Sequence, residues 1–377
     1  MKISTSILTW FDIVKRDLPF RKNKNPYNIW VSEIMLQQTK VETVIPYYNN
    51  WIKKFPDVMS VAKAEEDVLL KSWEGLGYYA RCRNFHKAAK ILCENFNSKI
   101  PQSWNAFIGL PGVGEYTAGA VLSIAFNKPF IVLDGNVKRV MARVIGRRKL
   151  SKYNINLIKQ TLKKWLDKNR PGDFNEALME LGACICTPKK PKCSGCPINT
   201  LCIAYKSGNP LNYPSYIRKK SIPNYTFVGG VIRDKDKVLI QKRNEKMLSG
   251  LWEIPNKKIN SVKTSKNELE NYIIKHYQLS IKIKKKLGVI KHSYSHFNMN
   301  LVLFDCIKYS GITKSQKTYK WIKKSYDIQN RSRRGSTSGQ EKWFPGAPEV
   351  GNIMFSALSR LIRLLRPPDV SHLSHTT

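Results

Sequence analysis

Two different patterns of apolar and polar residues divide the chain. Through residue 205, apolar side chains recur at helical spacing in one segment after another, and glycine or proline separates the segments. The expected helical segments are 29–44, 61–73, 82–96, 117–126 and 137–144. After residue 223 the pattern predicts strands over 226–232, 237–242 and 299–306 and a helix over 266–277. We therefore expect a mainly α-helical domain followed by a smaller α+β domain.

Composition marks the expected domain boundaries. Residues 206–223 are rich in Pro, Ser, Asn and Lys and have no period, which is typical of a linker between a domain over 1–205 and one over 224–366. Within the second domain, residues 331–352 are rich in Arg, Ser and Gly, which predicts a surface insertion. An apolar helical stripe follows, and a tail spans 367–377. The stripe suits a closing helix on the second domain; a membrane-surface helix is the alternative.

The charge of the chain indicates the class of its partner. The 377 residues include 65 Lys and Arg against 27 Asp and Glu, a formal net charge of +38. Such an excess implies an anionic partner, and nine tryptophans indicate a folded protein rather than a basic tail. No apolar run is long enough for a membrane span, which favours nucleic acid over a membrane. Asp12 interrupts the first apolar stretch, a poor signal peptide, so we expect a cytoplasmic, nucleoid-associated protein.

Cysteines crowd into one short segment. Four of them follow the spacing C-x6-C-x2-C-x5-C, namely Cys186, Cys193, Cys196 and Cys202. Zinc sites usually join two close pairs of ligands that lie about 12–20 residues apart. Here there is one close pair of cysteines, with a single cysteine a few residues away on either side. The spacing favours a [4Fe–4S] cluster, in which each iron takes one thiolate. Zinc is the alternative, and Cys184 lies outside the pattern and is expected in the core.

Three further features are candidates for binding or chemistry. The turn LPGVG contains Gly112 and Gly114, which let backbone N–H groups approach a phosphate at the start of a helix. Glu33 lies in an apolar helix, where burial would raise its pKa and make it a candidate acid; a surface position is the alternative. Asp134 precedes a helix and fits an N-cap, although a capping carboxylate kept ionised by the helix dipole can also be catalytic.

These features resemble those of a known family. The hairpin LPGVGEYTAGAVLSIAFN, the aspartate in VLDGNVKRVMARV and the cysteine spacing resemble the helix-hairpin-helix base-excision glycosylases. The segments IWVSEIMLQQTKVETVIPYY and WEGLGYYARCRNFHKAA narrow the resemblance to the adenine DNA glycosylases, the MutY family, over about residues 5–205. The resemblance implies a monomeric hydrolase that removes adenine mispaired with 8-oxoguanine or guanine in double-stranded DNA.

The resemblance also implies roles for single residues. Glu33 would protonate the flipped-out adenine, and ionised Asp134 would stabilise the sugar cation. Gln38 and Tyr78 would enter the helix beside the oxidised guanine, with ordinary surface and core positions as the alternative. Bifunctional members of the superfamily carry a lysine nucleophile two residues past the second hairpin glycine. This chain has Tyr116 there, which we group with the DNA-contacting residues, so we expect base release without efficient strand cleavage.

The second domain resembles a Nudix fold in its segment GLWEIP. The carboxylates that a Nudix helix needs for magnesium are missing, because only Glu268 and Glu270 occur between residues 256 and 280. In the family this domain recognises 8-oxoguanine through a Phe-Ser-His loop, which corresponds here to Tyr294-Ser295-His296. The resemblance therefore implies that Ser295 and His296 read the lesion, with a plain turn as the alternative.

Three other functions compete with this reading. An endonuclease III-like bifunctional glycosylase for oxidised pyrimidines is disfavoured by Tyr116 and by the second domain. A non-catalytic iron–sulfur protein that binds DNA or senses redox state is disfavoured because both Glu33 and Asp134 are present. A nucleotide hydrolase is disfavoured by the missing magnesium carboxylates.

Overall fold

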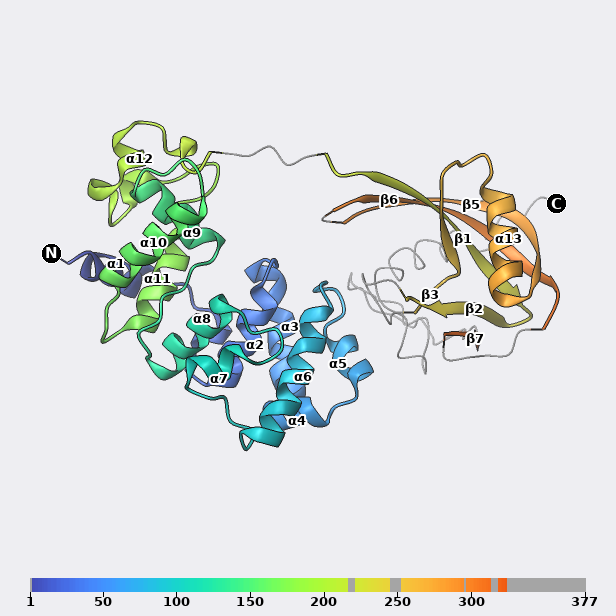
Figure 1. Cartoon of the computed structure of the whole chain (residues 1–377), viewed down its shortest axis with the longest axis horizontal. Coiled ribbons are helices and arrows are strands. Elements are labelled where there is room, and N and C mark those ends of the chain that lie inside the picture. The colour runs from blue at the N-terminus through green and yellow to red at the C-terminus, as the bar shows by residue number, and fades with distance from the viewer. Residues whose placement is uncertain (1, 216–220, 245–251, 295, 313–317, 324–377) are drawn as a thin grey trace, which may run out of the picture. The chain divides into compact units, whose positions relative to one another are not determined.

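A computed structural model describes residues 2–215, 221–244, 252–294, 296–312 and 318–323 (Figure 1). The chain divides into two compact units, Met1–Arg218 and Lys219–Thr377. The predicted surface insertion over 331–352, the apolar stripe after it and the tail over 367–377 lie outside the described residues, as does Ser295.

The first unit is built from helices joined by short turns (Figure 1). Its α-helices are α1 (Ile3–Val14), α2 (Pro26–Leu36), α3 (Val41–Lys54), α4 (Val58–Lys63), α5 (Glu66–Ser72), α6 (Ala80–Asn95), α7 (Trp104–Ile108), α8 (Glu115–Phe126), α9 (Gly135–Val144), α10 (Lys152–Trp165), α11 (Pro171–Cys184) and α12 (Ile203–Lys206). Four 3-10 turns accompany them, at Pro19–Arg21, Cys193–Gly195, Asn199–Leu201 and Pro210–Asn212. Helix α1 packs with α9, α10 and α11 around Phe11, Met141 and Phe174. Trp30 and Phe85, whose ring centroids lie 4.5 Å apart, belong to the core of α2 and α6.

The sequence pattern located the helices better than it located their ends. The helices expected over 82–96, 117–126 and 137–144 are confirmed as α6, α8 and α9. The segments 29–44 and 61–73 were each predicted as one helix and are wrong in that respect, because each contains two. In the segment 29–44 the chain turns at Gln38, and its φ of 58° ends the helix, although apolar residues occur both before and after this turn.

The second unit is a mixed sheet with one described helix. Its strands are β1 (Asn224–Asp234), β2 (Lys237–Lys242), β3 (Trp252–Glu253), β4 (Asn256–Ile259), β5 (Ser280–Ser293), β6 (Asn298–Ser310) and β7 (Tyr319–Lys323), and its helix is α13 (Ser265–Tyr277). The strand order is β3-β2-β1-β6-β5; β1 and β6 are parallel, β4 pairs with β1, and β7 pairs with β2. One face of the sheet packs on α13 through Leu269 and Ile273, and the other buries Phe227 and Leu301.

The predicted strands and helix of the second unit are all confirmed, and the mixed α and β content agrees with the fold class. Strand β5 was missed because consecutive lysines interrupt its apolar alternation. The predicted linker over 206–223 is partly folded onto the first unit: Arg143 Nε donates to the carbonyl of Tyr213 at 2.9 Å, and Ser215 N–H donates to that of Arg148 at 2.8 Å. Throughout the described ranges, no helix combines the length and the apolarity that crossing a bilayer requires.

Candidate active site

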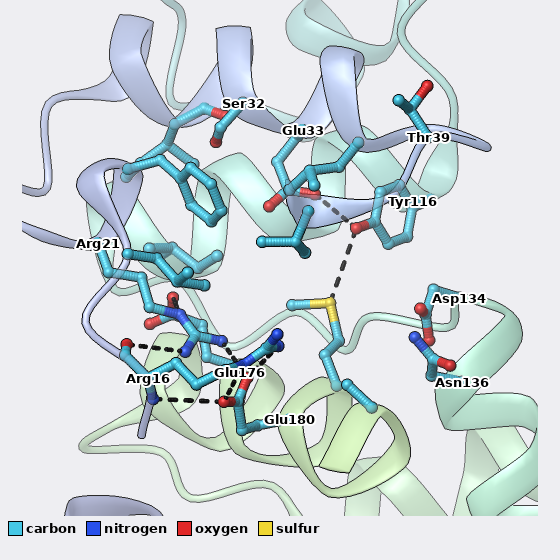
Figure 2. A pocket seen from close by; sticks show the side chains of 18 residues that line it. Arg16, Arg21, Ser32, Glu33, Thr39, Tyr116, Asp134, Asn136, Glu176 and Glu180 are labelled. Carbon is cyan, nitrogen blue, oxygen red and sulfur yellow. Dashed lines mark hydrogen bonds and ion pairs between the residues drawn. The ribbon is translucent and has the colours of Figure 1, made fainter. Parts of the chain in front are cut away.

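A cavity of about 170 Å³ lies among α2, α8, α11 and the start of α9 (Figure 2). Its polar lining includes Glu33, Tyr116, Asp134, Asn136, Glu176 and Glu180. The fold thus brings the two predicted catalytic carboxylates, Glu33 and Asp134, to the walls of one cavity. Figure 2 shows Glu33 and Tyr116 on one side of it and Asp134 with Asn136 on another.

Glu33 is buried, at 6% exposure, on a helix whose neighbouring side chains are almost all buried. Burial raises its pKa to about 7, against the opposing effect of a hydrogen bond from Tyr116. The Tyr116 hydroxyl donates to Glu33 Oε2 at 2.5 Å. The alternative of a surface glutamate is excluded. Near neutral pH the side chain is divided between its acid and its carboxylate, which suits a group that must give up a proton.

Asp134 is the N-cap of α9, and its Oδ1 accepts a hydrogen bond from Val137 N–H at 2.6 Å. The interpretation of Asp134 as a helix N-cap is therefore correct, and the same carboxylate also lines the cavity. The cap bond and the positive end of the α9 dipole hold negative charge at that wall. This arrangement can stabilise a cation that develops in the cavity.

Sequence reasoning missed a charged network on the third wall. Arg16 Nε and Arg21 Nη2 donate to Glu180 at 2.6 and 2.9 Å, and Arg21 Nε donates to Glu176 at 3.1 Å. Glu180 is 1% exposed; burial acts to raise its pKa, but the two guanidinium groups outweigh it and lower the pKa to about 2. The partners lie far apart in sequence. The only signal was two glutamates spaced i, i+4 on one face of α11.

The hairpin glycines differ in what they do. Gly112, between α7 and α8, has a φ of 80°, and a Cβ there would come within 2.8 Å of the Asn84 Cβ. Gly114 has an ordinary φ of −100° and is the N-cap of α8, where a Cβ would meet nothing within 4 Å. Gly112 is therefore needed for the turn itself, whereas Gly114 leaves the first N–H groups of α8 uncovered, as an anion site requires.

Tyr116 lies in the first turn of α8 but not on the hairpin surface. Its hydroxyl points into the cavity, donates to Glu33, and lies 3.6 Å from Met179 Sδ. Burial and the neighbouring Glu33 carboxyl hold the pKa of Tyr116 well above its ordinary value, so the hydroxyl remains a donor. Tyr116 was expected among the DNA-contacting residues together with the hairpin glycines; its side chain lines the cavity, and its contact with DNA stays a prediction.

Gln38 and Tyr78 lie in two turns, one between α2 and α3 and one before α6. Both side chains are exposed, and Tyr78 is 47% exposed, which excludes a core role for its ring. Both residues have left-handed backbones, with φ values of 58° and 49°. Such conformations cost side-chain-bearing residues free energy and tend to be kept at functional sites.

The four patterned cysteines line a second hollow, together with residues of α9 and α11. None of the eight cysteines, all of which the structure describes, forms a disulfide. Arg143 Nη1 donates to Cys186 Sγ at 3.2 Å, and Arg139 Nε donates to the Cys186 carbonyl at 2.9 Å. In the part of the chain that the structure describes, no three His, Cys, Asp or Glu side chains converge closely enough to hold a single metal ion. Four thiols that line one hollow supply the four thiolates that a [4Fe–4S] cluster needs.

Comparison with known proteins agrees with this geometry. A family model for HhH-GPD superfamily base excision DNA repair proteins matches residues 31–168. Models of the iron-sulfur binding domain of endonuclease III and of the NUDIX domain match residues 186–202 and 227–329. Adenine DNA glycosylase of Buchnera aphidicola subsp. Schizaphis graminum (strain Sg) is 37% identical over 337 residues, which are 87% of this chain and 93% of that protein.

The chain belongs to the adenine DNA glycosylase family.

A second adenine DNA glycosylase, from Rattus norvegicus, is 30% identical over 412 residues, covering 89% of this chain and 80% of its own. Among solved structures, a thermostable thymine-DNA glycosylase is 30% identical with a TM-score of 0.51, covering 54% of this chain and 95% of its own. Like other DNA glycosylases, this adenine DNA glycosylase family member binds DNA. The iron-sulfur model runs from the first patterned cysteine to the last, and the chain accordingly carries a [4Fe–4S] cluster.

Two features of the second unit bear on its place in this adenine DNA glycosylase. On α13, Glu268 forms an ion pair with Lys257, and the two charged atoms lie 2.6 Å apart. Tyr294 and His296 lie between β5 and β6, where Tyr294 N–H donates to the Phe297 carbonyl at 2.9 Å. The rings of Tyr294 and His296 pack 4.8 and 5.0 Å from the ring of the buried Phe297, which anchors the turn.

Proposed function

We propose that this protein acts as a monomer on nucleoid DNA in the cytoplasm and hydrolyses the N-glycosidic bond of adenine mispaired with 8-oxoguanine or guanine. The observation that carries the proposal is one cavity whose walls bring together Glu33, which accepts a hydrogen bond from Tyr116, and Asp134. The pKa shifts of two buried glutamates of this cavity agree with it. Burial raises the pKa of Glu33 to about 7, whereas paired guanidinium groups lower that of Glu180 to about 2. Such a separation assigns one group to proton donation and the other to permanent negative charge.

Glu33 is the proposed acid. Adenine leaves a deoxyribose poorly unless a ring nitrogen, N7 in this proposal, is protonated as the bond breaks. The hydrogen bond from Tyr116 fixes the orientation of the Glu33 carboxyl. Tyr116 itself has no amine with which to attack the sugar, so the reaction ends with base release and an intact strand.

Asp134 is the proposed stabiliser of the sugar. Bond breaking leaves positive charge on the deoxyribose ring, and a carboxylate held by Val137 N–H at the cavity wall stabilises that charge without having to reorganise. Glu180 and Arg21 supply a fixed acceptor and donor on the third wall. Adenine presents both an exocyclic amine and ring nitrogens, so this wall is suited to holding it once it is flipped from the helix.

The remaining predicted residues are proposed to bind DNA, the lesion or the cluster. Gly112 and Gly114 shape the phosphate site at the start of α8, and Gln38 and Tyr78 enter the duplex beside the oxidised guanine. Ser295, which lies outside the described residues, and His296 read the lesion. The proposed cluster ligands are Cys186, Cys193, Cys196 and Cys202. When bound, the cluster supplies iron–thiolate bonds that tie this loop together, while Arg143 positions Cys186.

A single-turnover assay on the purified holoprotein tests the proposal. We expect adenine release from duplexes with adenine opposite 8-oxoguanine, slower release opposite guanine, and no release of thymine glycol from a control duplex. Release of thymine glycol without adenine release would instead indicate the pyrimidine-specific alternative. Strand breaks without alkali treatment would contradict the monofunctional assignment.

A further inference from the structure

One guanidinium group lies between the two turns that carry Gln38 and Tyr78. Arg81, in the first turn of α6, directs Nη1 to the end of α2, where it donates to the carbonyls of Ile34, Met35 and Gln37 at 2.7, 3.1 and 2.6 Å. Its Nη2 donates to the carbonyls of Leu76 and Gly77 at 3.1 and 3.2 Å and to Thr39 Oγ1 at 3.4 Å. Nη1 therefore bonds to the turn that carries Gln38, and Nη2 bonds to the turn that carries Tyr78 and also to the turn that carries Gln38.

The surroundings of Arg81 show that its guanidinium group is held inside the fold and does not form a surface ion pair. Its guanidinium carbon lies 5.5 Å from the Trp73 ring centroid and 5.4 Å from that of Tyr78. Burial lowers its pKa to about 10, so it keeps its charge at neutral pH. Within the described ranges no carboxylate pairs with it, and its charge is offset by carbonyl dipoles. Two strained turns, each open to solvent, are thus fastened to one cation.

We infer that Arg81 is a positioning residue that locks the turns bearing Gln38 and Tyr78 into one preformed wedge for entering the DNA helix opposite the adenine. The inference rests on the proposed DNA-reading role of these two residues. A left-handed backbone at Gln38 and Tyr78 persists only if neighbouring contacts enforce it. The fork of Arg81 is the contact that the two turns share, so it sets their separation and orientation before DNA arrives.

Lysine is the informative substitution at this position. Arg81→Lys keeps the charge but offers one ammonium group, which cannot fork between two turns. Arg83→Lys is a matched control, because Arg83 lies on the same helix and pairs with Glu66 of α5 at 2.9 Å. A second background, Gln38→Ala with Tyr78→Ala, removes the side chains through which Arg81 would act.

The experiment uses the full-length holoprotein and a duplex with the target adenine, or 2-aminopurine in its place, opposite 8-oxoguanine. We expect Arg81→Lys to slow single-turnover adenine release by roughly tenfold to a hundredfold and to reduce the 2-aminopurine signal of base flipping. Iron content and melting temperature should match those of Arg83→Lys, which should behave as the parent. Hydrogen exchange should rise at residues 37–40 and 75–79 only. In the Gln38→Ala, Tyr78→Ala background, Arg81→Lys should have little further effect.

Three results would overturn the inference: parental flipping and release in Arg81→Lys, an equal loss in the doubly substituted background, or faster exchange throughout the unit. If the Gln38→Ala, Tyr78→Ala protein itself flips and releases adenine like the parent, the proposed reading role of these residues fails, and Arg81 loses its role with it. If Arg81→Lys does not fold, Thr39→Val removes the hydroxyl that accepts from Nη2 and donates to the Gln37 carbonyl, and it leaves the other bonds of Arg81 in place. Thr39→Val should slow adenine release, reduce the 2-aminopurine signal and raise hydrogen exchange at the two turns, each by less than Arg81→Lys does. Parental values of all three would count against the inference.

Discussion

The hydroxyl of Tyr116 donates to Glu33 Oε2 at 2.5 Å inside a cavity that almost fully buries the carboxyl group. The two residues come from α8 and α2, and their contact joins the hairpin helix to the helix that carries the proposed acid. A lysine at this position is what the resemblance implies for a bifunctional glycosylase. The tyrosine of this chain instead donates a hydrogen bond to the proposed acid.

The two proposed catalytic carboxylates should be separable from DNA binding. Glu33→Gln and Asp134→Asn should each nearly abolish single-turnover adenine release, because both act on the transition state and neither is placed against a phosphate. Binding to an uncleavable mismatched duplex should stay within a few-fold of the parent. A near-parental rate in either variant would remove that residue from the mechanism.

The pH dependence of the rate follows from the raised pKa of Glu33. The protonated form is the donor, so the single-turnover rate should be highest below pH 7 and fall as pH rises through about 7. The hydrogen bond from Tyr116 opposes the rise in pKa. Tyr116→Phe should therefore move the falling limb to higher pH, and a pH profile of both proteins measures the shift. A limb that moves to lower pH contradicts the assigned direction.

Glu180 should matter for stability as well as for the cavity. Glu180→Gln leaves the guanidinium groups of Arg16 and Arg21 without their shared carboxylate and should destabilise the unit by roughly 3 kcal/mol. The pKa of Glu180 is lowered to about 2, so its contribution is complete above the ordinary value of 4.5 and is lost as pH falls toward 2. Denaturant unfolding of both proteins at several pH values should show the difference shrinking in acid. A constant difference would mean that packing, not charge, is responsible.

The cluster ligands can be told from the neighbouring thiol by one pair of variants. Cys196→Ser should lose iron and the visible absorption of the cluster, and the loop should unfold locally. Cys184→Ser should keep both, because Cys184 lies outside the four-cysteine hollow and its Sγ donates to Glu180 instead. Iron analysis of purified proteins decides the matter. Equal iron loss in both would show that the assignment of Cys184 is wrong.

The proposed lesion reader predicts a difference between two substrates. Changing Ser295 and His296 to Ala should slow release opposite 8-oxoguanine more than release opposite guanine. The exposed His296 ring packs against the ring of Phe297, which is itself buried, so its removal leaves the buried anchor in place. Uniform loss on both substrates indicates a structural turn.

The sequence was sufficient wherever the relevant information was local. The spacing of four cysteines, the apolar surroundings of Glu33 and the capping position of Asp134 all lie within short segments, and the structure agrees with each. What escaped prediction depends on contacts between distant segments. The pairing of Arg16 with Glu180 joins opposite ends of the first unit, and the direction of the Tyr116 hydroxyl depends on how α8 packs against α2.

Strand β5 and the left-handed turns were hidden for different reasons. Lysines at successive positions erase the period of two in β5, although Ile281 and Ile283 still pack against the sheet core. Gln38 and Tyr78 are not glycines, so no residue type announced the positive φ. The guanidinium of Arg81 bonds to both turns, and an arginine in an amphipathic helix does not indicate such contacts in sequence.

The guanidinium of Arg143 joins two parts of the first unit. It donates to Cys186 Sγ and also to the carbonyl of Tyr213, close to the last described residue of that unit. One side chain therefore holds both a proposed cluster ligand and the segment around Tyr213, so a change at either contact is expected to be felt at the other.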